Sequence, residues 1–283
     1  MIDLHCHSTV SDGALSPREV VRLAARNGCR LLALTDHDHT GGLAEAREEA
    51  AQHGIRLISG VEISVTWYGR TIHMVGLDFD AENEALQTLL ARVRSGRVER
   101  MRQMAQRLEK KGIGGAFDGA MALAVNPEMV SRTHLAEFLL QQGLVRNKQQ
   151  AFTKYLGEGK CAYVCHQWAD LAEAVAAVRA AGGIAVIAHP MRYDLSATAR
   201  RRLFAEFQAA GGTAVEVHSG SCSLSDRLNY ALLAQQFDFA ASAGSDFHRE
   251  GGYGGVLGAC PELPPICQPV WARFREPFRL GGS

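Results

Sequence analysis

Residues 1–12 read MIDLHCHSTVSD, an apolar stretch in which acidic and imidazole side chains recur at every second position. Alternate residues of a strand point to opposite faces, so His5 and His7 share one face of a strand predicted at residues 2–7. Two imidazoles at this spacing can chelate one metal ion, and Asp12 follows in the loop beyond the strand. A His-x-His pair also occurs by chance, so the prediction of a metal site depends on further ligands along the chain.

The composition limits the class of protein. The chain has 283 residues, a formal net charge of +0 and 47% apolar residues, enough for one large domain or for a barrel with an insertion. A neutral chain argues against a broad nucleic-acid footprint, although a local basic pocket is compatible with it. No run of about 20 apolar residues predicts a membrane span, and no signal peptide is recognisable. The cysteines are odd in number and form no CxxC pair, so we expect a reducing, cytoplasmic environment.

Strand and helix patterns alternate along most of the chain. Ser16-Pro17-Arg18-Glu19 reads as the start of a helix, with an N-cap, a proline at the first helical position and a capping-box glutamate. Short apolar runs between helices favour a parallel sheet covered by helices, so we predict an α/β fold with a (β/α) barrel. Its seven strands are expected at residues 2–7, 30–35, 56–65, 71–79, 184–188, 213–217 and 239–243.

Residues 82–168 interrupt this alternation. One long arginine-rich helix is predicted up to about residue 111, and the segments that follow are short, helical and irregular. We interpret 82–168 as a helical subdomain inserted over the barrel mouth, with 1–81 and 169–283 forming the barrel domain. The basic face of the long helix either contacts an anionic substrate or is simply solvated. It carries Arg92, Arg94, Arg97, Arg100 and Arg102.

Histidines and acidic residues collect where the predicted strands end, which is where (β/α) barrels place their active sites. Six imidazoles and three carboxylates are too many for one ion, because a catalytic zinc uses about three protein ligands. The set suits two or three divalent ions, and nitrogen and oxygen ligands without thiolate favour Mn²⁺, Fe²⁺ or Zn²⁺. Each residue alone is equally compatible with a hydrogen-bonded core position. The nine candidates are His5, His7, Asp12, His37, Glu62, His73, His189, Asp246 and His248.

These motifs together resemble the PHP (polymerase and histidinol phosphatase) family, which belongs with the amidohydrolase-like barrels. The resemblance spans residues 2–248 and implies a distorted (β/α)7 barrel with a trinuclear metal centre, manganese being the metal that we expect first. It also implies that Glu62, Asp246 and His248 are catalytic. The motifs are His5-x-His7, Asp12, Thr35-Asp36-His37, Gly60-x-Glu62, Ile72-His73, Ala188-His189-Pro190 and Ser245-Asp246-x-His248.

The resemblance assigns each ligand to an ion. One ion would be held by His5, His7, Glu62 and Asp246, and Glu62 would bridge to a second ion. That second ion would also be bound by His73 and His189, and the third by Asp12, His37 and His248. Asp36 or Asp38 would orient ligand imidazoles, and Glu216 is a further candidate for a supporting role.

The family hydrolyses phosphate esters, and the insertion is similar to that of one branch. Members of this branch remove the 3′-phosphate from nucleoside 3′,5′-bisphosphates, and close relatives trim short RNA from the 5′ end. Arg132 and His134 within the insertion can donate to a phosphate or can form a helix cap and a surface pair. Ser8 and His218 are further candidates for substrate contact.

The expected activity is therefore that of a metal-dependent phosphoesterase on a small nucleotide, with no stable protein partner. The alternatives are a 5′-3′ exoribonuclease on short RNA, a histidinol-phosphate phosphatase and, in a different class, a non-catalytic accessory module of a polymerase.

Overall fold

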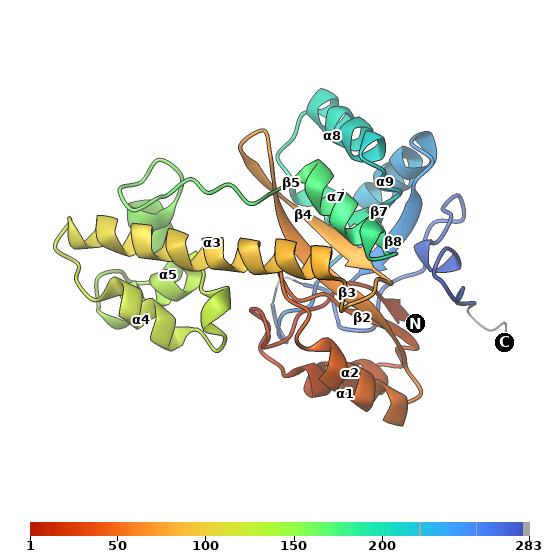
Figure 1. Ribbon diagram of the computed structural model, residues 1–283, viewed down its shortest axis with the longest axis horizontal. Helices are drawn as coiled ribbons and strands as arrows, with labels where there is room; N and C mark the ends of the chain where they lie inside the picture. Colours follow the sequence, from red (N-terminus) through yellow and green to blue (C-terminus); the bar gives the residue numbers. More distant parts are fainter. Residues whose placement is uncertain (221, 253, 280–283) are drawn as a thin grey trace. The chain divides into compact units, whose positions relative to one another are not determined.

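The computed structural model describes residues 1–220, 222–252 and 254–279, and it divides into two compact units. One unit combines Met1–Leu90 with the chain from Ala169 onward, and the other is Ala91–Trp168 (Figure 1). The boundary falls within α3 (Glu84–Glu109), whereas the insertion predicted from the sequence contains this whole helix. No described helix has the length and apolar character that a membrane span requires.

The first unit is built on a sheet that closes into a barrel, as predicted. Its strand order is β1-β2-β3-β4-β6-β7-β8, and β5 pairs with β3 outside this path. The ends of the order meet because Leu4 N donates to Ala243 O at 3.0 Å and Asp246 N donates to His5 O at 2.7 Å. The strands are β1 (Ile2–Asp3), β2 (Leu31–Leu34), β3 (Arg56–Trp67), β4 (Arg70–Leu77), β5 (Ala169–Asp170), β6 (Ile184–Ile187), β7 (Ala214–Ser219) and β8 (Ala240–Gly244).

The expectation of a wholly parallel sheet is wrong at β4, which runs antiparallel to both β3 and β6. Tyr68 and Gly69 alone connect β3 to β4, and both have positive φ angles, 45° and 75°. A two-residue loop with this backbone makes a tight hairpin and reverses the chain, whereas a parallel crossover needs a dozen or more residues.

The first strand is shorter than predicted. Only Ile2–Asp3 forms a ladder, and beyond it Cys6 makes a single bridge to Phe247. The segment that carries His5 and His7 therefore departs from regular strand geometry while it stays fully buried.

Helices cover the barrel, and its interior is apolar. Ser16 and Glu19 form the predicted capping box at the start of the first helix, with Pro17 at the first helical position. The barrel core includes the fully buried Leu4 and Leu77. The helices of this unit are α1 (Pro17–Arg26), α2 (Leu43–Gln52), α7 (Leu171–Ala180), α8 (Ala197–Ala209), α9 (Leu224–Gln236) and the start of α3, with 3-10 turns at Pro190–Arg192 and Val270–Ala272.

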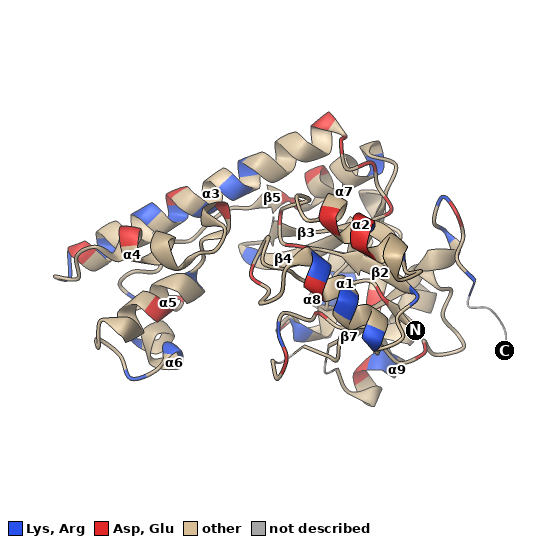
Figure 2. Ribbon diagram, turned by 90° about the horizontal axis from the view of Figure 1, so that it is seen from below, with Lys and Arg blue, Asp and Glu red and all other residues tan. Residues whose placement is uncertain are grey.

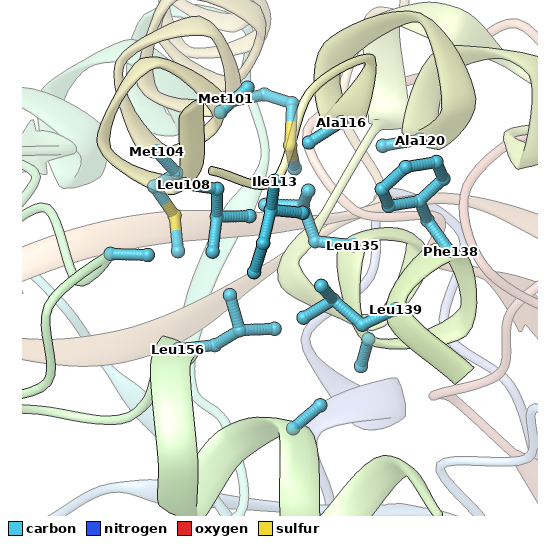
Figure 3. Packing of buried hydrophobic residues seen from close by; sticks show 14 of the residues in the cluster. Met101, Met104, Leu108, Ile113, Ala116, Ala120, Leu135, Phe138, Leu139 and Leu156 are labelled. Atoms are coloured by element: carbon cyan, nitrogen blue, oxygen red, sulfur yellow. The ribbon is translucent and has the colours of Figure 1, made fainter. Parts of the chain in front are cut away.

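The second unit has a hydrophobic core of its own, drawn in Figure 3. Met104 and Leu108 of α3 pack with Leu135 and Leu139 of α5, and all four are fully buried. A separate core of this kind is what allows an insertion to fold as a compact unit. Besides α3, its segments are α4 (Ala116–Leu123), α5 (Arg132–Gln141), α6 (Lys148–Ala151), a 3-10 turn at Pro127–Met129 and a π-helical turn at Phe152–Leu156.

We expect Leu135→Ala to destabilise the chain by about 2–5 kcal/mol, because it removes buried methyl groups and leaves a cavity. Leu144→Ala is the matched control in the same unit, since Leu144 is 37% exposed, and it should cost less than about 1 kcal/mol. Urea unfolding followed by circular dichroism measures both variants. Equal costs would show that the helical unit lacks a tightly packed core.

Candidate metal centre

The nine predicted ligands lie on elements that meet at one rim of the barrel. His37 follows β2 and pairs with Glu62 of β3 through a bridge. His73 lies in the first half of β4. Because β4 is antiparallel, its first residues lie at the same rim as the last residues of the parallel strands, and this places His73 at the rim. His73 is in register with Ser64, two residues beyond Glu62.

Glu62 occupies the middle of this set and is fully buried. Its Oε1 lies 2.9 Å from His73 Nδ1 and 2.8 Å from His189 Nε2. The other oxygen, Oε2, lies 3.2 Å from His5 Nε2, 3.2 Å from His7 Nε2 and 3.0 Å from His37 Nδ1. The two oxygens of this carboxylate thus face two sets of imidazoles, as a bridge between two ions would require.

Candidate ligand atoms gather in three groups, and within each group they lie within 4.8 Å of one another. His7, His37 and Glu62 each belong to two groups, and His189 lies outside all three but contacts Glu62. The grouping is compatible with the assignment that the family resemblance implies, which itself stays a prediction. The groups are His5–His7–Glu62–Asp246, His7–Asp12–His37–His248 and His37–Glu62–His73.

The unsatisfied atoms of the site show that it fits divalent ions. His5 Nδ1 lies 2.6 Å from Glu216 Oε1, so a neutral His5 ring keeps its proton on Nδ1 and directs the Nε2 lone pair at the centre. There it meets His7 Nε2 at 3.1 Å. Buried polar atoms without a hydrogen-bond partner are rare, and a cation among converging lone pairs satisfies them. Those of this site are Glu62 Oε2 and the Nδ1 atoms of His7, His37, His73 and His189.

The charges of the site suit ligation as well. Burial alone would raise the pKa of the Glu62 carboxyl, but the imidazoles, His37 foremost, hold it well below its usual range. Burial acts in the same way on Asp246, and His5 and His7 hold its pKa well below its usual range. The pKa of His37 is lowered by its burial, despite the carboxylates of Glu62 and Asp12. His5 and His7 differ from His37: despite their burial, the surrounding carboxylates raise the pKa of His5 well above its usual range and that of His7 to about 10. Metal binds neutral imidazoles, so both rings would lose a proton when a divalent ion binds.

Three buried carboxylates support the ligands. Asp36 accepts hydrogen bonds from the amide and hydroxyl of Ser8, at 2.8 Å and 2.6 Å. Asp38 accepts from the amide and hydroxyl of Ser64, at 2.7 Å and 2.9 Å. Glu216 bonds the ring of His5 and accepts the amide of His189 at 2.6 Å. Glu216 therefore orients the His5 ring, and Asp36 and Asp38 hold the amides and hydroxyls of Ser8 and Ser64.

Sequence reasoning missed Arg192. It ends the turn after His189-Pro190, and its Nη1 donates to Asp246 Oδ2. Gly220 leaves room for it, because a Cβ there would lie 2.7 Å from Arg192 Nη2. An arginine three residues after a strand-end histidine was the available signal.

The four residues predicted to contact substrate lie in different parts of the structure, and their roles stay predictions. Ser8 is fully buried and its hydroxyl donates to Asp36. His218 Nδ1 lies 3.2 Å from Cys222 Sγ, and burial together with nearby Arg227 lowers the pKa of His218 to about 4. Arg132 and His134 belong to the helical unit, where His134 Nδ1 accepts the Ser131 amide at 3.0 Å in the cap arrangement.

Replacing Glu62 tests the bridge. Glu62→Gln removes the negative charge and leaves one oxygen, so the metal content should fall from about two or three ions per chain to about one or none. Elemental analysis measures the content, and circular dichroism checks the fold. Glu49→Gln is the matched control, because Glu49 is also buried but binds Arg22 at 2.7 Å. An unchanged metal content in the Glu62 variant would contradict the bridge.

Replacing Arg192 tests its competition with metal. The guanidinium binds Asp246 Oδ2, so Arg192→Ala should free this carboxylate and tighten Mn²⁺ binding by about tenfold, measured by chelator competition. Arg200→Ala, which removes a cation stacked over Tyr230, should leave the affinity unchanged. Weaker binding in the Arg192 variant would mean that Arg192 holds Asp246 in its ligating position.

Known proteins are similar to this chain over nearly its full length. A 3′,5′-nucleoside bisphosphate phosphatase from Chromobacterium violaceum is 53% identical over 270 residues, 95% of this chain and 95% of that protein. A 5′-3′ exoribonuclease from Haemophilus influenzae is 45% identical over 272 residues, 96% of this chain and 98% of that protein.

Solved structures agree with the fold. An amidohydrolase from Chromobacterium violaceum, with bound sulfate and no metal, has a TM-score of 0.88 and 52% identity, covering 96% of this chain and 95% of its own. A Bifidobacterium adolescentis protein described as a metal-dependent phosphoesterase has a TM-score of 0.78 and 29% identity, covering 94% and 93%. The PHP domain model matches residues 3–164, and the chain belongs to the PHP domain family.

Proposed function

We propose that the chain is a metal-dependent phosphatase that removes the 3′-phosphate from nucleoside 3′,5′-bisphosphates and yields nucleoside 5′-monophosphate and phosphate. The observation that carries the proposal is the buried Glu62 carboxylate, which faces two sets of imidazoles. The 53% identity to a phosphatase with this substrate supports the choice of ester. Within the family, the nine ligands suit two or three ions, and we propose manganese first.

The residues of the chain hold the site in a reactive form. Divalent ions, when bound, neutralise phosphoryl oxygens, acidify water to make a nucleophile and stabilise the leaving alkoxide. Glu62, Asp246 and His248 are the proposed catalytic residues, and Glu216 keeps the ring proton of His5 away from the centre. His5, His7 and Glu62 are fully buried, and their burial excludes bulk water and strengthens each charge interaction there.

Arg192 adds a donor at the edge of the site. Its side chain is 36% exposed and spends one N–H on Asp246, so the remaining guanidinium N–H groups can bind a phosphoryl oxygen. We propose Arg132 and His134 as contacts of the second phosphate, and Ser8 and His218 as further substrate contacts, on the strength of the sequence motif.

A second candidate function is 5′-3′ exoribonuclease activity on short RNA. The 45% identity to an exoribonuclease over nearly the whole chain favours it. Both activities use the same metal chemistry, and they differ in whether the attacked bond is a phosphomonoester or a phosphodiester.

A cytoplasmic location is part of the proposal, supported by seven cysteines that are all unpaired in the structure.

Phosphate release by the Mn²⁺-loaded protein tests the substrate. A second phosphate contributes charged hydrogen bonds, so kcat/KM for a nucleoside 3′,5′-bisphosphate should exceed that for the 3′-monophosphate by roughly 10–150-fold. Chelation should abolish both activities, and Mn²⁺ should restore them. Equal rates on the two esters, with faster release of mononucleotides from 5′-phosphorylated RNA, would favour the exoribonuclease.

A further inference from the structure

One tyrosine contacts both of the histidines that lie at Oε1 of Glu62. Tyr193 follows the turn Pro190–Arg192, which begins directly after His189. Its phenol ring lies edge-on to the His189 ring, with the two ring centroids 5.5 Å apart and an angle of 66° between the ring planes. Its hydroxyl contacts the backbone of His73 on β4. Tyr193 therefore links two candidate ligands that come from different strands.

The hydroxyl of Tyr193 takes the place of a strand partner of His73. β4 pairs antiparallel with β6, and this ladder ends at Met74, opposite Ile187. At the next position Ala188 N donates to His73 O at 3.1 Å, whereas His73 N donates to Tyr193 Oη at 2.8 Å. In a regular antiparallel pair both bonds join the same two residues, so the phenol oxygen occupies the acceptor position that the strand would supply.

The neighbouring strand does not supply this acceptor because the chain turns away at His189. This residue has a φ of 28° and a ψ of 54°, in the left-handed region that residues other than glycine rarely adopt. Such a conformation persists only where surrounding contacts hold it. The amide of His189 donates to Glu216 Oε2 at 2.6 Å, and its ring packs on Tyr193. Tyr193 thus lies where both histidines need support.

The hydroxyl of Tyr193 is kept in its neutral form. Burial raises the pKa of the Tyr193 phenol well above its usual range. A neutral phenol can accept the His73 amide and also donate to a carbonyl, and His73 O lies 3.4 Å from the hydroxyl. Removal of the hydroxyl would leave the His73 amide without this acceptor, and an unpaired donor inside a protein is costly.

The turn that carries Tyr193 is itself fixed at two further points. The hydroxyl of Tyr230 on α9 donates to Pro190 O at 2.8 Å, and Arg192 donates to Asp246 Oδ2. A supporting side chain holds a ligand accurately only when its own backbone is fixed. The turn therefore provides a firm base for the contacts that Tyr193 makes.

The imidazoles at the other oxygen of Glu62 have different supports. Glu216 contacts the His5 ring at 2.6 Å. The ring of His7 packs against the rings of His37 and His248, with centroid distances of 4.5 Å and 4.1 Å. None of these contacts involves Tyr193, so the two sides of the carboxylate can be disturbed separately.

We propose that Tyr193 is a positioning residue for one ion of the metal centre, the ion on the Oε1 side of Glu62. Its hydroxyl fixes the backbone of His73, and its ring holds the imidazole of His189. The proposal rests on the proposed function, because it takes the metal centre from it. It goes beyond that function in giving one ion a support that the other ions do not share.

Calorimetric titration of the metal-free full chain with Mn²⁺ tests the inference. Tyr193→Phe keeps the ring and removes only the hydroxyl. Loss of a residue that supports a metal ligand lowers metal affinity by about 10–100-fold. One Mn²⁺ ion should therefore bind more weakly by roughly this factor, and the affinities of the other ions should stay within about twofold of wild type. The Mn²⁺ concentration for half-maximal phosphate release should rise by the same factor.

Tyr68→Phe is the matched control, because it removes the same hydroxyl from the loop between β3 and β4. Tyr68 contacts Glu206 and Arg202 of α8, which belong to the charged residues spread over the helices (Figure 2). All Mn²⁺ affinities should stay unchanged in this variant. Thermal melting of the metal-free proteins checks the fold. Tyr193→Met carries the test if the phenylalanine variant does not fold, because the flexible methionine side chain fills space without a hydroxyl.

The outcomes separate this inference from the proposed phosphatase activity. Unchanged Mn²⁺ binding in the Tyr193 variant, or equal weakening of every ion, would overturn the positioning role alone. Selective weakening of one ion in a chain that does not hydrolyse the bisphosphate would overturn the phosphatase alone. Fewer than two Mn²⁺ ions on the wild-type chain would overturn both.

Discussion

The buried carboxylate of Glu62 is the constraint on which the barrel rim depends. An ionised carboxylate away from water is costly unless partners compensate it, and both oxygens of Glu62 are surrounded by imidazoles at 2.8–3.2 Å. These rings come from segments far apart in the sequence, so the charge can be satisfied only when the whole rim is assembled. The same arrangement directs lone pairs of several side chains at the centre. Bound metal ions would satisfy these lone pairs, whereas the protein alone leaves them without a partner.

The three buried carboxylates that support the ligands meet a second requirement, which is to hold the ligands in fixed orientations. Glu216 links two histidines, because it holds the ring of His5 and the amide of His189. Asp36 and Asp38 fix their neighbouring segments through serine hydroxyls and amides. Since all three acids are buried, each hydrogen bond is costly to break, and the ligand positions are set before any ion binds.

The sequence predicted the parts of this structure that follow from local patterns. The capping box at Ser16 and the alternation of strands with helices are local features, and both are confirmed. The direction of β4 was missed because a run of apolar residues does not show whether a strand is parallel or antiparallel to its neighbours. The signal lay in Tyr68-Gly69, where two positive φ angles make a hairpin. Arg192 was missed because its contact with Asp246 joins residues that are 54 apart in sequence.

The chemistry of the rim explains why a family with one metal centre acts on different phosphate esters. Ions attract a phosphoryl group by charge, and charge alone distinguishes poorly between a bisphosphate and the end of an RNA chain. Selectivity must then come from donors that contact the remainder of the substrate, and energy from such remote contacts can be used to raise the rate of the chemical step. In this chain the helical unit has its own hydrophobic core, so substitutions on its surface can occur without disturbing the ligands of the barrel.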